Sequence, residues 1–385
     1  MKAAIVYDRV NKWGGAERVL LALHKVLPDA PLYTSVYSPE TAKWAKVFPR
    51  VIPSFLQKFP ILNKYHELLG WLTPIAYESF SFDEYDLVIT VTSEAAKGII
   101  TKPHTKHICY CLTPTRYLWS GYKEYLDNPP KSLGWIPFYK VISQPFLKYA
   151  KHWDKIAGQR PDIMIAISQE VKVRIKTYYK RESKIIYPPV DVEKYSNKNT
   201  LLTAVDMDRK IIHKTSNHNL ETESYYLIVS RLEPYKKVDI AIKAFNDLGY
   251  PLMIIGKGSE EARLRVMANK NIIFQGFVDD RDLPYFYQNA KGFIYPQIED
   301  FGITAVEAQA AGVPVIALKR GGALDTIIEN KTGVFFKNQN KKSLIEAIIK
   351  FEKMKFDKNI LRNNAKKFSK EIFMKEILDL VRKTV

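Results

Sequence analysis

The chain has 385 residues, 46% hydrophobic and 26% charged, which suits two domains and the composition of an ordinary soluble globular protein. Its formal net charge of +18 predicts an anionic partner: nucleic acid, an acidic lipid surface or a phosphorylated ligand. The sequence holds no run of about 18 uncharged apolar residues, which argues against a membrane-spanning helix. The N-terminal MKAAIVYD is typical of a strand rather than a signal peptide, so we expect a cytoplasmic protein.

The first half of the chain alternates short apolar runs with amphipathic stretches. After the strand predicted in MKAAIVYD, Gly14 and Gly15 open a helix whose apolar residues recur at helical spacing from Val19 to Val26. Further strands are predicted in LYTSVYS, DLVITVT, HICYCLT, IMIAIS and KIIYPPV. This alternation predicts a parallel sheet with helices on its faces, in a first domain that covers residues 1–194.

Two features of this first domain bear on its chemistry: a pair of cysteines and a stretch rich in basic, aromatic and proline residues. Cys109 and Cys111 are separated by one residue, where a disulfide would be strained and a metal site would need more ligands, so we predict reduced thiols. Residues 47–80 mix basic residues with Phe, Trp, Leu and several prolines. They form either a packed irregular part of the core or a surface that contacts acidic lipid headgroups or a lipid-linked acceptor.

The polar residues 195–224 predict a linker, after which the alternating pattern restarts. Strands are predicted in YYLIVS, PLMIIG, NIIFQG, GFIYP, VPVIAL and GVFF, with helical stretches between them. We therefore predict a second doubly wound domain over residues 225–365, with ligands bound in a cleft at the carboxyl ends of both sheets. The amphipathic C-terminal stretch, residues 366–385, is expected to pack back on the first domain.

The stretch EDFGITAVE, residues 299–307, predicts a ligand site at the end of a strand. Free amides at a helix start near Thr304, with Gly302 allowing close backbone approach, make an anion site. Glu299 and Glu307 would accept hydrogen bonds from sugar hydroxyls but would not bind phosphate. The combination suits a sugar nucleotide. Alternatively, Thr304 and Glu307 form a capping box and Glu299 is a solvated loop acid.

Basic side chains and glycines follow other predicted strands. Arg231 and Lys236, in SRLEPYKK, are suited to phosphate, although a solvated basic turn would have the same residues. Gly256, in IIGKGSEE, lies in a strand-to-helix turn and is a weak signal by itself. Gly14 and Gly15 occupy the corresponding turn of the first domain.

The motifs together resemble the family 4 retaining glycosyltransferases of GT-B fold. The resemblance rests on EDFGITAVE, on SRLEPYKKVD upstream and on GGALDTI downstream, and it covers nearly the whole chain. It is closer still to the O-antigen mannosyltransferase-like branch, through TPTRYLW, IAISQEVKVRIKTYYKR and IYPPVDVEKY. It implies two Rossmann-like domains that face each other across a cleft. It also implies transfer from a nucleotide-diphosphate sugar with retention at the anomeric carbon and without a metal or other cofactor.

The resemblance also implies a role for each matching residue. Arg231 and Lys236 would hold the diphosphate and stabilise the leaving charge, Glu299 would hold the transferred sugar, and Glu307 would bind the ribose. The remaining donor-side contacts would come from Gly302, Ile303, Thr304 and Gly256, with Gly14 and Gly15 completing the cleft. On the acceptor side, Arg116 and Lys97 would orient the acceptor.

Two departures from the family pattern concern single residues. Leu112 stands where a histidine would contact the donor sugar or the acceptor, and it leaves that histidine without a direct replacement. His107, at the other end of the same predicted strand, is expected to be structural or superficial. Lys237 replaces a glycine that commonly follows the phosphate-binding lysine.

The leading interpretation is transfer of a hexose, with mannose from GDP-mannose as the best candidate, to a lipid-linked or surface glycan. The transfer would take place at the cytoplasmic face of a membrane, with no nucleic acid involved. The main alternative is a degenerate sugar-nucleotide binder without activity, which Leu112 motivates. The combination of Arg231, Lys236, Glu299 and Glu307 argues against an epimerase or a hydrolase. A metal-dependent GT-A enzyme would rely on Asp206 and Asp208 in the polar linker, and a nucleic-acid binder would need its basic residues clustered.

Overall fold

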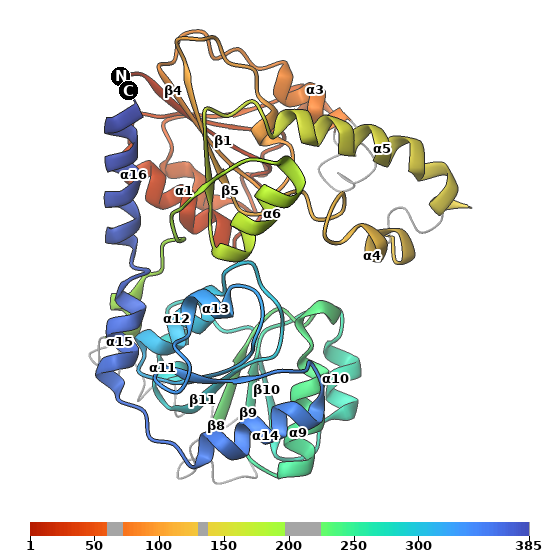
Figure 1. Cartoon of the computed structure of the whole chain (residues 1–385), viewed down its shortest axis with the longest axis vertical. Helices are drawn as coiled ribbons and strands as arrows, with labels where there is room; N and C mark the ends of the chain where they lie inside the picture. Colours follow the sequence, from red (N-terminus) through yellow and green to blue (C-terminus); the bar gives the residue numbers. More distant parts are fainter. Residues whose placement is uncertain (60–71, 130–137, 197–224, 385) are drawn as a thin grey trace. The chain divides into compact units, whose positions relative to one another are not determined.

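A computed structural model describes residues 1–59, 72–129, 138–196 and 225–384 (Figure 1). The chain divides into unit 1, which comprises Met1–Pro189 and Glu371–Val385, and unit 2, which comprises Val190–Lys370. Each unit is built on its own parallel sheet. The prediction of two doubly wound α/β domains is therefore confirmed.

The sheet of unit 1 has the strand order β3-β2-β1-β4-β5-β6-β7, and all its strand pairs are parallel. Its strands are β1 (Ala3–Tyr7), β2 (Leu32–Thr34), β3 (Val51–Pro53), β4 (Leu87–Thr92), β5 (Lys106–Cys111), β6 (Ile163–Ala166) and β7 (Lys184–Ile185). The order reverses between β1 and β4, so the loops that follow these two strands meet at the switch point of the sheet.

The helices of unit 1 lie between these strands and at the C-terminus. They are α1 (Gly15–Val26), α3 (Thr73–Glu78), α4 (Tyr122–Asp127), α5 (Tyr139–Ala157), α6 (Gln169–Tyr179) and α16 (Lys370–Thr384). Short 3-10 helices are η1 (Lys43–Val47), η2 (Phe55–Lys58) and η4 (Ala96–Gly98). The C-terminal α16 packs on unit 1, where the ring of Phe373 meets that of Tyr110 edge-on at 5.6 Å.

The described part of residues 47–80 forms β3, η2 and α3, whereas residues 60–71 lie outside the described structure. Leu56 and Ala76 are buried against Val36 in a small apolar cluster, so the packed interpretation holds for this part. Val47 and Phe59 are exposed, and the lipid-contact interpretation stays a prediction.

The sheet of unit 2 has the order β10-β9-β8-β11-β12-β13 and is also parallel. Its strands are β8 (Tyr225–Val229), β9 (Leu252–Ile255), β10 (Ile272–Gly276), β11 (Ala290–Tyr295), β12 (Val315–Leu318) and β13 (Gly333–Phe336). The central strands are continuously apolar because helices cover both faces of a parallel sheet.

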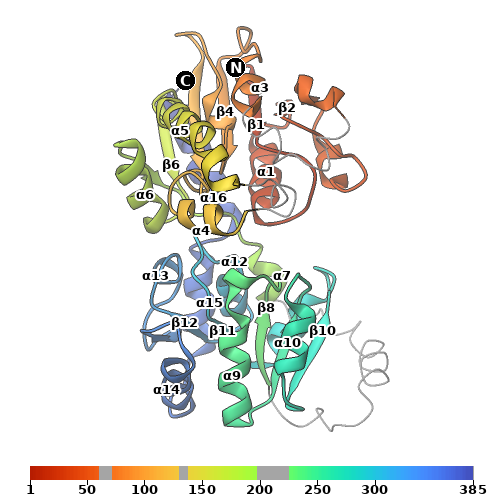
Figure 2. The same cartoon turned by 90° about the vertical axis from the view of Figure 1, so that its right-hand side faces the viewer.

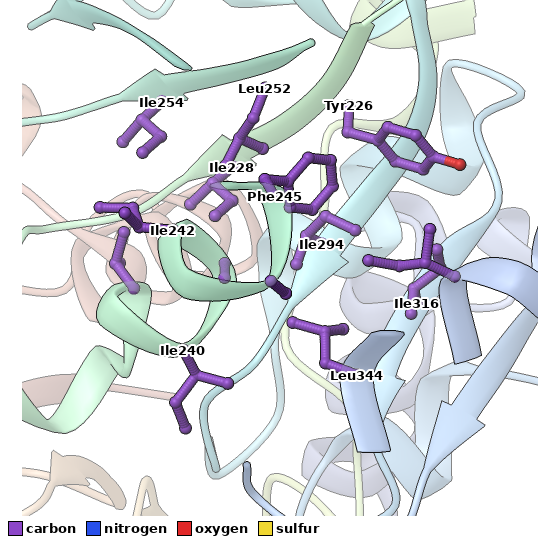
Figure 3. Packing of buried hydrophobic residues seen from close by; sticks show 14 of the residues in the cluster. Tyr226, Ile228, Ile240, Ile242, Phe245, Leu252, Ile254, Ile294, Ile316 and Leu344 are labelled. Carbon is purple, nitrogen blue, oxygen red and sulfur yellow. The ribbon is translucent and has the colours of Figure 1, made fainter. Parts of the chain in front are cut away.

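Two layers of helices cover this sheet (Figure 2). They are α7 (Val192–Ser196), α9 (Val238–Leu248), α10 (Glu261–Met267), α11 (Leu283–Gln288), α12 (Ile303–Ala310), α13 (Ala323–Thr326), α14 (Lys341–Glu352) and α15 (Lys358–Lys366). Helices α9, α10 and α14 pack together over one face, and α7, α11, α12 and α15 pack together over the other. In Figure 3, Phe245 of α9, Leu344 of α14 and Ile294 of β11 lie in the same core.

The chain passes between the units at two adjacent points. Val190 and Ser369 form an isolated parallel bridge, in which the amide of Val190 donates to the carbonyl of Phe368 at 2.9 Å. Lys370 and Asp191 add an ion pair at 3.2 Å. The division therefore falls at 189/190 and 370/371. Of the linker predicted over residues 195–224, the first two residues end α7, and residues 197–224 lie outside the described residues.

Two further sequence predictions concern the whole chain. Cys109 and Cys111 are both buried and free, which confirms the prediction of reduced thiols. Among the described helices, none combines the length and the apolar character that crossing a membrane would require.

Candidate functional site

The strongest candidate site in unit 2 lies at the switch point of its sheet. Strand β8 has β9 on one side and β11 on the other, so the chain reverses its winding between β8 and β11. The loop after β8 carries Arg231 and Lys236, and the loop after β11 carries Glu299 and Gly302. Ligands of open parallel sheets bind where such loops diverge.

Lys236 and Glu299 form an ion pair that joins these two loops. The Nζ atom of Lys236 contacts Oε1 of Glu299, and the two side chains are only 14% and 23% exposed. Lys236 ends the short 3-10 helix η6 (Pro234–Lys236). Lys236 and Glu299 are 63 positions apart in the sequence, and both were predicted to bind the same ligand. In the structure they lie in direct contact.

Tyr235 links the two basic side chains of the β8 loop. Its hydroxyl accepts a hydrogen bond from Nη2 of Arg231 at 2.6 Å, and the ammonium of Lys236 lies 5.2 Å from its ring centroid. Tyr235 was not among the residues predicted from the sequence. The only available signal was its position between the two basic residues of the motif.

Gly302 shapes the start of α12. It is the N-cap residue and has φ of 97°, a left-handed conformation that favours glycine. A Cβ atom there would stand 2.5 Å from the hydroxyl oxygen of Tyr295. Ile303 and Thr304 occupy the first turn of α12, where backbone amides have no carbonyl partner within the helix and can meet an anion.

The structure decides against the capping box at Thr304 and Glu307. Helix α12 begins one residue earlier, and its N-cap makes no side-chain hydrogen bond. Glu307 instead is 1% exposed, and its Oε2 accepts a hydrogen bond of 3.0 Å from the hydroxyl of Tyr287. Tyr287 belongs to α11, so a neighbouring helix fixes the orientation of the Glu307 carboxylate.

Gly256 has a packing role in the turn after β9. A Cβ atom there would stand 1.8 Å from the carbonyl oxygen of Ser230, and φ is 134°. Its amide donates to the carbonyl of Gly276 at 2.8 Å. Gly256 therefore allows the β8 and β9 loops to touch, and its amide is already used.

Two glycines after β12 support the loop that carries Glu299. A Cβ atom at Gly322 would stand 2.3 Å from Phe301 Cα, and one at Gly321 would stand 2.6 Å from the carbonyl oxygen of Glu299. The amide of Gly322 donates to that same carbonyl at 2.8 Å. Both glycines belong to the motif GGALDT, which by itself did not predict a role for them in the site.

In unit 1, Gly14 and Gly15 begin α1 after β1. Gly14 is the N-cap residue, and a Cβ atom there would stand 3.1 Å from Oε2 of Glu17. Glu17 is 1% exposed and accepts a hydrogen bond of 2.7 Å from the hydroxyl of Tyr7. The buried carboxylate of Glu17 therefore lies next to the turn that contains Gly14 and Gly15.

The two acceptor-side candidates differ in accessibility. Lys97 is 1% exposed and pairs with Asp154 at 2.6 Å. Burial opposes its charge, but the Asp154 carboxylate outweighs that effect and the pKa of Lys97 is raised. Lys97 therefore joins η4 to α5 through Asp154, and its contact with an acceptor stays a prediction, whereas Arg116 is exposed.

His107 is a buried structural residue. Its Nε2 lies 3.0 Å from the hydroxyl of Thr90, and burial, with smaller contributions from Arg181 and Arg160, lowers its pKa to about 3. It does not replace the histidine missing at Leu112. Among the described residues, no three His, Cys, Asp or Glu side chains gather as a metal ion would require.

Comparison with known proteins identifies the family. Residues 13–194 match the model described as Glycosyltransferase Family 4, and residues 208–368 match that of Glycosyl transferases group 1. Together the two models cover most of the chain, which therefore belongs to the group 1, family 4 glycosyltransferases.

The curated relatives resemble parts of the chain. O-antigen chain mannosyltransferase C of Escherichia coli is 24% identical over 55% of this chain and 57% of its own length. The GDP-mannose-dependent alpha-(1-6)-phosphatidylinositol monomannoside mannosyltransferase of Mycobacterium tuberculosis is 33% identical over 31% of this chain and 36% of its own. The chain spans 62% of the length of the first curated relatives, two uncharacterized glycosyltransferases of Methanocaldococcus jannaschii.

The solved structures agree with the fold. HepE of Anabaena, in a complex with UDP and glucose, matches over 100% of both chains with a TM-score of 0.69 and 19% identity. At this identity the likeness concerns the fold alone. The fold is the two-domain GT-B arrangement that the resemblance implied.

Proposed function

We propose that the protein is a retaining hexosyltransferase that uses a nucleotide-diphosphate sugar. The observation that carries the proposal is the contact between Lys236 and Glu299 at the switch point, beside the start of α12. A diphosphate-linked sugar needs a cation for its phosphates and an acceptor for its hydroxyls within a few ångströms. This contact supplies both from neighbouring loops.

The chemistry assigned to each side chain follows from its charge. When the bond between the anomeric carbon and the phosphate oxygen breaks, negative charge grows on the leaving diphosphate. Lys236 and Arg231 would stabilise that charge more in the transition state than in the ground state, which accelerates the reaction. Glu299 would accept hydrogen bonds from the hexose, Glu307 from the ribose, and the amides of Ile303 and Thr304 would meet the phosphates.

Mannose from GDP-mannose is our first candidate for the donor. Its support is that the relatives include an O-antigen chain mannosyltransferase and a GDP-mannose-dependent mannosyltransferase. The acceptor we propose is a lipid-linked or surface glycan, reached from the cytoplasmic face of a membrane. We propose that the transfer requires no metal ion and that the protein has no nucleic-acid partner.

Exchange of Glu299 tests the proposal. Glu299→Ala should lower turnover of the donor by about 100-fold or more, because contacts to the reacting sugar are lost, while the melting temperature stays close to that of the wild type. The measurement is release of nucleoside diphosphate from a panel of nucleotide sugars, with the anomeric configuration of the product read by NMR. Glu329→Ala is the matched control, since it removes an acid of the same unit that pairs with Lys319 at 2.6 Å. Equal turnover in both variants would show that Glu299 is not part of the site. A product with inverted anomeric configuration would show that the enzyme is not retaining.

The second candidate function is a sugar-nucleotide binder without activity. Leu112 motivates it, since the histidine of the family pattern has no replacement, and His107 is buried. Such a protein would bind a nucleotide sugar without consuming it. Any turnover that Glu299→Ala abolishes would discard this candidate.

A further inference from the structure

The ion pair of Lys236 and Glu299 joins two side chains that the proposed function assigns to different parts of the donor. The Nζ atom of Lys236, assigned to the phosphates, contacts Oε1 of Glu299, assigned to the hexose. In the part of unit 2 that the structure describes, Glu299 pairs with no other basic side chain. The ammonium has a single positive charge, which Glu299 already neutralises. A phosphate that approaches Lys236 therefore competes with Glu299 for that charge.

Partial burial makes this competition strong. The side chains of Lys236 and Glu299 are 14% and 23% exposed, whereas the pair of Lys341 and Asp247 on the surface of the same unit is 46% and 50% exposed. Water screens a partly buried pair less than an exposed one. If Lys236 turns to a phosphate, the carboxylate of Glu299 keeps its charge in a place that water solvates incompletely. That costs free energy unless another donor replaces the ammonium.

Backbone contacts hold both residues in place. The carbonyl of Glu299 accepts a hydrogen bond of 2.8 Å from the amide of Gly322, and the amide of Lys236 donates to the carbonyl of Glu233 at 2.9 Å. A Cβ atom at Gly321 would stand 2.6 Å from the carbonyl oxygen of Glu299, so the two loops are packed backbone to backbone. We therefore expect the pair to separate by rotation of its side chains, with the loops staying where they are.

From this arrangement we infer that Glu299 competes with phosphate for Lys236, so that the site distinguishes a nucleotide-diphosphate sugar from the free nucleoside diphosphate. A nucleotide sugar brings phosphates for Lys236 and hexose hydroxyls that donate hydrogen bonds to the Glu299 carboxylate. A nucleoside diphosphate brings phosphates alone. It leaves the carboxylate without a donor, beside the negative charge of the ligand.

The consequence is selective weakening of the spent product. If Lys236 is released by Glu299 for about one tenth of the time, a phosphate binds about tenfold more weakly than to a site in which Lys236 is always available. The hexose of the intact donor offsets this loss, and the free diphosphate does not. Glu299 would therefore favour release of the product after transfer. The inference rests on the proposed function, because it takes the donor to be a nucleotide-diphosphate sugar.

Calorimetric titration of the full chain without an acceptor tests the inference. The probes are GDP with GDP-mannose, and UDP with UDP-glucose. Glu299→Gln keeps the size of the side chain and removes its charge, so we expect it to bind the nucleoside diphosphate about tenfold more tightly than the wild type. Affinity for the nucleotide sugar should rise much less or fall, because the hexose loses a charged acceptor. The preference for the sugar-bearing ligand should therefore shrink by about tenfold.

Glu352→Gln is the matched control, because it removes the same charge from a glutamate of the same unit with similar exposure. Glu352 is 24% exposed and pairs with Lys291 at 2.6 Å. Lys291 lies near the start of β11, whereas Glu299 follows the end of that strand, so the control pair is at the other end of the sheet. The control should bind all four ligands as the wild type does. Melting temperatures measured without ligand check that both variants fold.

A double-mutant cycle shows whether Glu299 acts through Lys236. The cycle compares the wild type, Glu299→Gln, Lys236→Ala and the combined variant. When Lys236 is absent there is no ammonium to compete for, so Glu299→Gln should then tighten binding of the nucleoside diphosphate no more than Glu352→Gln does. An equal gain with and without Lys236 would show that Glu299 merely repels phosphate, and would overturn the inference.

The remaining outcomes separate the inference from the proposed function. A wild-type protein that binds none of the four ligands would overturn both. A wild type that binds a nucleotide sugar, with Glu299→Gln no tighter than the wild type for the matching diphosphate, would overturn the inference alone. Equal gains for the diphosphate and for the nucleotide sugar in Glu299→Gln would also overturn it, because Glu299 would then not respond to the hexose.

Discussion

Single residues of the candidate site owe their positions to side chains that would not touch a ligand. The carboxylate of Glu307 is held by the hydroxyl of Tyr287 at 3.0 Å, and the guanidinium of Arg231 is held by the hydroxyl of Tyr235 at 2.6 Å. Gly302 is required because its φ of 97° and the nearby hydroxyl of Tyr295 both exclude a side chain. Neighbours of this kind are separated in the sequence and could not be selected from it, whereas the glutamates and the lysine could.

Removal of the Tyr287 hydroxyl tests this arrangement at the residue scale. Tyr287→Phe should weaken binding of nucleoside diphosphate by about tenfold, as expected for one lost hydrogen bond to a charged group. Isothermal titration of the purified variant measures it. Tyr226→Phe is the control, because it also removes a buried tyrosine's hydrogen bond to a glutamate, Glu352, in the core of the same unit. If both variants bind the nucleotide as the wild type does, Tyr287 does not position Glu307 for ligand.

At the scale of elements, the strands were easier to predict than the helices. Strands β8 to β13 are short apolar runs with turn residues at both ends, a pattern that single-sequence reasoning detects. Strand β3 was missed, because it has three residues, ends in Pro53 and lies at the sheet edge. Helix α5 was missed, because Pro145 and the exposed apolar side chains disturb its pattern. Helices α14 and α15 were also missed, although Asn340 and Asp357 cap them.

The start of helix α9 gives a second prediction. Lys237 is its N-cap residue and has φ of 54°, which accounts for the glycine common at this position of the family pattern. Lys237→Gly should change the free energy of unfolding by less than about 1 kcal/mol, whereas Lys237→Val should lower it by about 1–2 kcal/mol, because a β-branched residue resists the left-handed conformation.

Denaturation in urea measures both values, and Lys243 of the same helix is the control position. There the helical backbone should make glycine the more destabilising of the two substitutions, by a few tenths of a kcal/mol or more. The account of Lys237 would be contradicted if the glycine and valine variants ranked in the same order of unfolding free energy at both positions.

At the scale of the whole molecule, the family and the fold could be predicted together, because motifs at the carboxyl ends of strands report on both. The roles of the site residues stay predictions. The linker could not be tested, since residues 197–224 lie outside the described structure. Lys97 shows a further limit of the sequence. The family resemblance implied an acceptor contact for Lys97, and the sequence did not indicate its pairing with Asp154, which joins η4 to α5.

The stability of the whole chain should depend on pH through His107. Its pKa is lowered to about 3 in the folded state, so between pH 6.5 and pH 3 the unfolded chain binds a proton that the folded chain does not. The free energy of unfolding should therefore fall as pH falls, by about 2 kcal/mol from pH 7 to pH 5 for this residue. His107→Gln should reduce the slope, whereas His104→Gln, at an exposed histidine, should leave it unchanged. Equal slopes in the wild type and in His107→Gln would contradict this.

The central claim is that the loops after β8 and β11 bind a nucleotide-diphosphate sugar. The most direct test is the melting temperature of the wild type and of Lys236→Ala with GDP, GDP-mannose, UDP and UDP-glucose. A ligand that binds only the folded state stabilises it by about 2.7 kcal/mol at 100 times its Kd. We predict an upward shift for the wild type, with GDP and GDP-mannose as the first candidates, and a much smaller shift for Lys236→Ala. No shift with any of these ligands, or equal shifts in both proteins, would contradict the account.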